Sequence, residues 1–154
     1  MTIPVLDQLF AALSPVAYAL LRFIVGFALI PHGLRVTFGF FPTTGQPVRN
    51  LTMLAEHLEQ GGFRPGKFWA PLISLTELVV GPMLALGLLT RLAAIPIVIF
   101  LFVSLFERWR VGKYFWNKLG IEYTLMWLIA AFYVLVHGSG TFSLDALLFG
   151  GNIF

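Results

Sequence analysis

Four apolar stretches, each near the length needed to cross a lipid bilayer, constrain the fold of this chain more than any other feature. They cover residues 14–31, 68–89, 92–109 and 122–137 of the 154. A transmembrane helix needs about 20 residues, and flanking aromatic or basic side chains allow shorter ones. Charged residues make up only 11% of the chain, which is far below the share in soluble domains. We therefore expect an all-α integral membrane protein, a four-helix bundle forming one domain, with a re-entrant third segment as the alternative.

The first long loop is predicted to contain a short amphipathic helix. Asn50 is a favourable helix cap, and Gly61 and Gly62 are a favourable stop. Between them the apolar residues follow helical spacing: Leu51, Leu54, Ala55 and Leu58. Such a helix fits the lipid headgroup region.

Basic side chains are divided unequally between the two sides of the predicted bundle. Four lie between the first and second spans and four between the third and fourth, whereas the other side carries only Arg91. The positive-inside rule then places both long loops in the cytoplasm and both termini outside, in a bacterial-type inner (plasma) membrane. The same rule explains the net charge of +3 without a nucleic-acid partner.

Arg22 and Glu77 lie in the middle of the first and second apolar stretches. Charged side chains at membrane depth are costly, so they mark a functional site or a buried pair. Counted from the ends of the stretches, both lie roughly 13–15 Å deep, and antiparallel helices would bring them together. A structural salt bridge and a proton- or ligand-handling carboxylate both fit. Gly26 and Gly81, one turn after each charge, predict close approach of the two helices.

A second group of polar side chains is expected at the cytoplasmic boundary of the bundle. It consists of His32, Trp116, Asn117, Glu122 and Tyr123. With Arg22 and Glu77 these residues are our candidates for a quinone or ligand pocket, because a His and a carboxylate can relay protons to a head group held among aromatics. The alternative is an ordinary polar helix boundary with Glu122 near a helix N-terminus. No residue is assigned as catalytic.

The sequence contains no self-sufficient redox centre. There is no cysteine, and the three histidines are predicted at different depths, which disfavours haem held by two of them. No metal-ligand spacing is present. Electron transfer would therefore need a protein partner or a bound quinone, with no covalent cofactor. Besides the lipid bilayer, we expect a protein partner or a second copy of the chain.

Several short motifs occur in order along nearly the whole chain: Leu21-Arg22-Phe23, Pro31-His32-Gly33, Glu77-Leu78, Gly87 to Ala93, Phe115-Trp116-Asn117, Glu122-Tyr123 and Phe142 to Asp145. Together they resemble the DoxX family of small four-helix membrane proteins. The family takes its name from a small subunit of a thiosulfate:quinone oxidoreductase. The resemblance therefore implies a membrane subunit of, or accessory to, a quinone-linked respiratory or redox oxidoreductase.

Two other functions compete with this interpretation. The first is a non-catalytic membrane anchor or assembly subunit of a larger complex, in which the buried charges only hold the bundle together. The second is a small-solute carrier, which is less favoured because no internal repeat is visible in the sequence.

Overall fold

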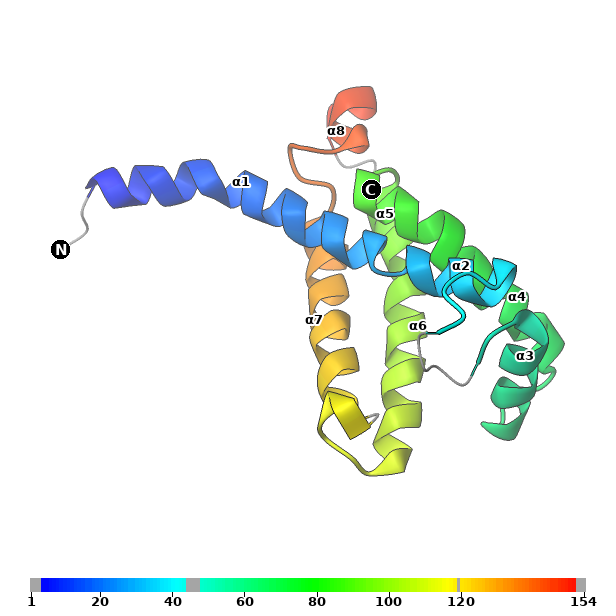
Figure 1. Ribbon diagram of the computed structural model, residues 1–154. Coiled ribbons are helices and arrows are strands. Elements are labelled where there is room, and N and C mark those ends of the chain that lie inside the picture. The colour runs from blue at the N-terminus through cyan, green and yellow to red at the C-terminus, as the bar shows by residue number, and fades with distance from the viewer. Residues whose placement is uncertain (1–3, 44–47, 119, 152–154) are drawn as a thin grey trace.

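The computed structural model describes residues 4–43, 48–118 and 120–151, and all regular structure within them is helical (Figure 1). This confirms the predicted all-α membrane bundle. The α-helices are α1 (Pro4–Phe27), α2 (Ile30–Phe38), α3 (Leu51–Gln60), α4 (Gly66–Leu75), α5 (Gly81–Leu86), α6 (Thr90–Val111), α7 (Ile121–His137) and α8 (Leu144–Phe149). A π-helical segment, η1 (Thr76–Val80), joins α4 to α5, and a 3-10 turn, η2 (Trp116–Lys118), precedes α7.

Three helical units are long and apolar enough to cross a membrane: Pro4–Phe38, Gly66–Leu86 and Thr90–Val111. Helix α7 is apolar but shorter, with 17 residues. The first unit begins well before residue 14, since proline suits the first turn of a helix and Asp7 complements the dipole there. The third unit is one continuous helix despite Pro96, so no turn gives it the shape of a re-entrant segment.

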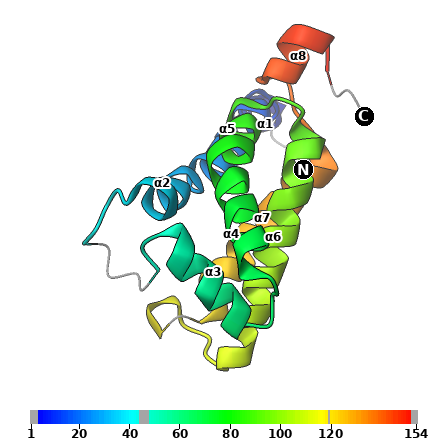
Figure 2. The ribbon, with the colours of Figure 1, turned by 90° about the vertical axis from the view of Figure 1, so that its right-hand side faces the viewer.

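The helices pack around a small apolar core. Helices α6 and α7 lie antiparallel and side by side, while α4, η1 and α5 form a second column beside them (Figures 1 and 2). Helix α1 crosses α5 and α7 at a wide angle (Figure 1). The fully buried apolar side chains include Val25, Leu84, Ile97 and Val134, one from each of α1, α5, α6 and α7.

Helices α1 and α5 touch backbone to backbone, which confirms the close approach predicted from their glycines. A Cβ placed on Gly26 would lie 2.3 Å from the carbonyl oxygen of Gly81 and 2.4 Å from the amide nitrogen of Ala85. No other residue has room here, so the two glycines set the distance between the helices.

Helix α3 has the predicted bounds and the predicted cap. The Asn50 side chain accepts a hydrogen bond from the amide of Met53 at 2.8 Å, and the helix ends at Gln60 with Gly61 as its C-cap. Its apolar face turns toward α4, where Ala55 is buried close to Gly66. The C-terminal end of α3 approaches α6: a Cβ on Gly61 would lie 3.4 Å from the Glu107 side chain. Both long connections therefore lie at the end of the bundle opposite α8 (Figures 1 and 2).

Candidate functional site

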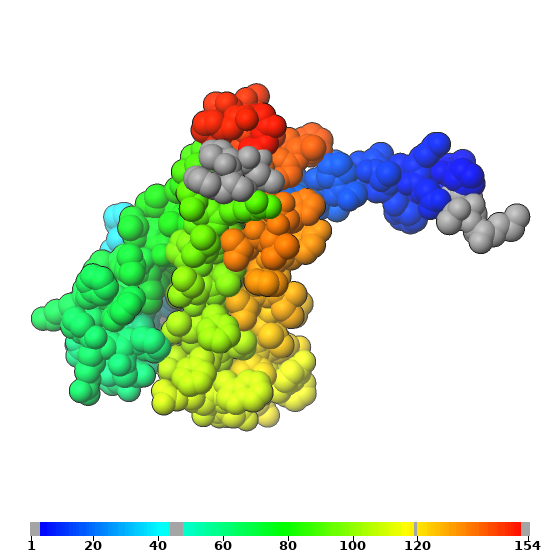
Figure 3. Space-filling model, turned by 180° about the vertical axis from the view of Figure 1, so that it is seen from behind, coloured from blue at the N-terminus to red at the C-terminus, as the bar shows by residue number. Residues whose placement is uncertain are grey.

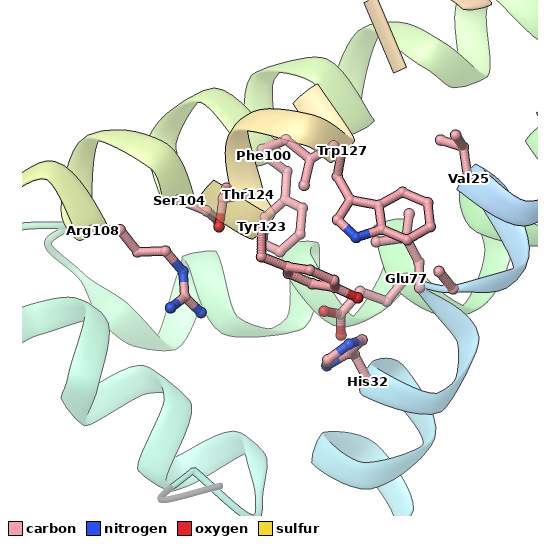
Figure 4. A pocket seen from close by; sticks show the side chains of 12 residues that line it. Val25, His32, Glu77, Phe100, Ser104, Arg108, Tyr123, Thr124 and Trp127 are labelled. Atoms are coloured by element: carbon pink, nitrogen blue, oxygen red, sulfur yellow. The ribbon is translucent and has the colours of Figure 1, made fainter. Parts of the chain in front are cut away.

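A cavity of about 140 Å³ lies where α1, α2, η1, α6 and α7 meet (Figure 4). Its wall is largely apolar, with a few polar side chains from four of these elements. The lining residues are Val25, Ala28, Leu29, His32, Glu77, Phe100, Leu101, Ser104, Arg108, Tyr123, Thr124 and Trp127. A concave apolar pocket with a few polar groups is the usual form of a small-molecule site.

Glu77 is the most unusual residue of this cavity. Its side chain is only 6% exposed, and its Oε2 atom has no hydrogen-bond partner among the described residues. An unsatisfied buried polar atom is rare in folded proteins and calls for a functional or structural reason. Because Glu77 lines a cavity, a bound molecule can satisfy it.

The local backbone explains how Glu77 reaches the cavity. Pro82 has no N–H to donate, and the turn before it widens into the π-helical segment η1, in which the Gly81 amide donates to the carbonyl of Thr76. Single π-turns inside helices are frequent at functional sites. Gly33 of α2 packs against the Cβ of Glu77, so a side chain at position 33 would push α2 away from η1.

His32 reaches the same cavity because the first helical unit is interrupted. Pro31 lacks an N–H and so cannot continue the ladder of α1, and the chain turns at residues 28–29 before α2 begins at Ile30. His32 then lies in the first turn of α2 with an exposed side chain. Figure 4 shows the His32 ring beside the Glu77 carboxyl group, with the Tyr123 hydroxyl directed to the same space.

Five polar or aromatic side chains of the cavity were not among the predicted candidates: Phe100, Ser104, Arg108, Thr124 and Trp127. A signal for them exists in the sequence. Ser104 and Arg108 are four residues apart on α6, and Tyr123 and Trp127 have the same spacing on α7, so each pair shares one helix face. Sequence reasoning missed them because each residue alone looks like an ordinary part of an apolar span.

The predicted pair between Arg22 and Glu77 is wrong. Arg22 is 3% exposed and donates instead to two backbone carbonyls, those of Ser139 and, at 2.5 Å, Phe142. Within the described residues the salt bridge found is the one between Arg110 and Glu107.

The register of the antiparallel helices explains the error. Glu77 lies beside Gly33, whereas Arg22 lies beside Gly87, on the other side of the Gly26–Gly81 contact. Positions 77 and 87 are about 15 Å apart along a helix. Counting depth from the ends of the apolar stretches failed because the first helical unit continues to Phe38, seven residues past the end of its stretch at residue 31.

Arg22 belongs to a second polar cluster, at the α8 end of the bundle. Next to it, the Asp145 carboxylate caps the N-terminus of α6, accepting from the amide of Leu89 at 2.7 Å and from the amide and hydroxyl of Thr90, both at 2.9 Å. Charged acceptors at the first amides of a helix are strongly favourable. This cluster joins three segments that are distant in sequence.

The other predicted pocket residues lie outside the cavity wall. Trp116 and Asn117 belong to the exposed η2 turn. Glu122 accepts a hydrogen bond from the Trp116 amide at 3.2 Å, so it orders the turn before α7. His32, Glu77 and Tyr123 are therefore the three candidates that the fold brings together. In the described parts of the chain, no three His, Asp or Glu side chains form a metal-ligand set.

The model of the DoxX family matches residues 17–107, which is more than half of the chain. The chain belongs to the DoxX family. It is therefore a small helical membrane protein, in agreement with the resemblance of its motifs. No curated protein and no solved structure matches this DoxX protein. The match includes Arg22, His32 and Glu77, whereas Tyr123 and Asp145 lie beyond its end.

Proposed function

We propose that this DoxX protein binds a quinone-like head group in the Glu77 cavity and acts as the membrane component of a quinone-linked oxidoreductase. The observation that carries the proposal is the buried carboxyl group of Glu77, with one oxygen unpartnered, on the wall of a cavity that also receives His32 and Tyr123. These three side chains supply the hydrogen-bond donors and acceptors that a quinone carbonyl and a quinol hydroxyl need.

The size and lining of the cavity favour an aromatic ring as the ligand. A cavity of about 150 Å³ is enough to hold benzene, and this one measures about 140 Å³. Phe100, Tyr123 and Trp127 offer ring faces and edges to a flat molecule. A quinone also carries an isoprenoid tail, which fits a site that lies among membrane helices.

Quinone reduction consumes two electrons and two protons. In our proposal the electrons come from a partner oxidoreductase, and the protons reach the two quinone oxygens through side chains of the cavity. Glu77 and Tyr123 line the cavity and would lie next to the bound quinone ring, while the exposed His32 connects the cavity to its surroundings. A carboxyl group and an imidazole are the usual groups for such transfers.

The experiment is an equilibrium titration of the purified protein in detergent with a short-chain quinone such as decylubiquinone. Losing one hydrogen bond of about 1.4 kcal/mol weakens binding about tenfold. We expect this loss for Tyr123→Phe and at least as much for Glu77→Leu. The matched controls, Tyr133→Phe on the same helix and Glu56→Leu on α3, should bind like the unchanged protein, since neither residue lines the cavity.

Two results would contradict the proposal. One is the absence of saturable quinone binding, with or without a partner protein. The other is equal binding by all four variants. Either would favour the non-catalytic anchor, which needs the bundle but not the cavity.

A further inference from the structure

The N-terminal half of α1 leaves the bundle and stands alone. Figures 1 and 3 show it projecting to one side of the body of the molecule, away from α6 and α7. All side chains from Pro4 to Ala17 are exposed except the half-buried Pro15, and burial begins at Tyr18. We call residues 4–17 the arm.

The arm is an amphipathic helix. Its large apolar side chains follow helical spacing along one face, and every one of them is exposed: Val5, Leu6, Leu9, Phe10, Leu13 and Val16. Asp7, Gln8 and Ser14 lie on the opposite face. This division is typical of a helix that lies between water and an apolar medium.

The rest of α1 fixes the direction of the two faces. Asp7, Ser14, Tyr18 and Arg22 share one face, because they are spaced by seven, four and four residues. Tyr18 and Arg22 donate to backbone carbonyls between α7 and α8, at the end of the bundle. The polar face of the arm therefore points toward that end of the bundle. Its apolar face points the opposite way, toward the apolar middle of the bundle.

The length of the first helical unit supports the same conclusion. Pro4–Phe38 contains 35 residues, or about 52 Å of helix, whereas the hydrocarbon core of a bilayer is about 30 Å thick. If the arm continued through hydrocarbon, Asp7 and Gln8 would face lipid without protein cover, which is unfavourable.

We infer that the arm is an interfacial helix that lies on the membrane surface at the α8 end of the bundle, with its apolar face in the lipid. This face continues without a break into the exposed Leu20, Phe23, Ile24 and Phe27 of the same helix, which belong to the lipid-facing surface of the bundle. Asp7 is the sole charged residue among positions 4–17. The arm therefore binds lipid by apolar insertion, without a requirement for anionic headgroups.

The test uses single spin-labelled cysteines, which need no background removal because the chain contains no cysteine. The protein is reconstituted in phosphatidylcholine vesicles, and the depth of each label is measured from its collision rates with oxygen and with a water-soluble nickel complex. Leu6→Cys and Leu13→Cys share the apolar face, and Asp7→Cys and Ser14→Cys share the polar face. Both pairs are seven residues apart.

For an interfacial arm, the two labels of each pair lie at equal depth, and the Leu6 and Leu13 labels are deeper than the other two. Adding phosphatidylglycerol leaves these depths unchanged. Ile95→Cys and Phe102→Cys, also exposed and seven residues apart, are the control on α6. Their depths should differ by about 10 Å.

Two outcomes would overturn the inference. A depth change of about 10 Å within each arm pair would show that the arm crosses the bilayer. Loss of contact with both oxygen and nickel at Leu6 and Leu13 would show that a second copy of the chain covers the apolar face.

Discussion

Arg22 and Glu77 illustrate two ways of holding an ionisable side chain inside an apolar bundle. Arg22 donates to two backbone carbonyls, so its guanidinium is part of the packing. Glu77 lies on a cavity wall with an oxygen that no described group satisfies. The first arrangement stabilises the fold, whereas the second costs stability that a bound ligand can restore.

This difference predicts opposite effects on the free energy of unfolding. Arg22→Leu removes the hydrogen bonds that Arg22 donates to the carbonyls of Ser139 and Phe142 and should lower the free energy of unfolding by about 2–4 kcal/mol. Glu77→Leu removes an unsatisfied buried carboxyl and should leave stability unchanged or raise it. Because the two sites are about 15 Å apart, the double variant should equal the sum within about 0.5 kcal/mol. Denaturation of the four proteins in mixed micelles measures all three values.

A salt bridge would give the opposite pattern. Each single substitution would then lower the free energy of unfolding, and the double variant would be more stable than the sum of the two losses predicts. That result would show that the two side chains meet in the membrane.

At the scale of elements, the contact between α1 and α5 depends on two glycines. A methyl group on Gly26 would meet backbone atoms of α5 at 2.3–2.4 Å, and backbone cannot rotate away as a side chain can. The same contact separates Arg22 from Glu77 and so divides the two polar clusters of the molecule.

Gly26→Ala should therefore force α1 and α5 apart and lower the free energy of unfolding by roughly 1–3 kcal/mol. Gly61→Ala is the matched control, since Gly61 has an ordinary helical φ of −73° and its nearest neighbours would lie 3.4 Å from the new methyl group. It should change stability by less than about 0.5 kcal/mol. Equal losses for both variants would mean that the close approach is not needed for folding.

The sequence predicts some of these elements better than others. Helix α3 was predicted at its observed bounds because Asn50 and Gly61 are local signals that act on their own neighbours. The sequence does not predict the π-helical segment at Glu77. Pro82 indicates only that the helix is disturbed, and packing decides which form the disturbance takes. The cavity depends on where α6 and α7 meet α1 and α2, which no local pattern specifies.

At the scale of the whole molecule, the two long connections gather at one end and α8 lies at the other (Figures 1 and 2). Eight basic residues lie in or next to these connections, whereas the α8 end has Arg91 and the buried Arg22. The positive-inside rule therefore still predicts that the connections face the cytoplasm and α8 the outside.

Labelling of intact cells with a membrane-impermeant thiol reagent tests this orientation. Thr43→Cys, exposed in the first long connection, should be protected until the membrane is opened. Leu147→Cys on α8, where the native side chain is 78% exposed, should react at once. The reverse pattern would mean that a partner or another determinant sets the topology.

The Arg22 and Asp145 contacts also bear on how the protein is made. The carbonyls that accept hydrogen bonds from Arg22 come 117 and 120 residues later in the chain. Asp145, which caps α6, comes 55 residues after Thr90. At a synthesis rate of about 5–20 residues per second, Arg22 waits roughly 6–24 s for its partners. During that time its guanidinium must stay in water, at the headgroups or within the insertion machinery. The first helix can therefore complete its packing only after the last helix has been translated.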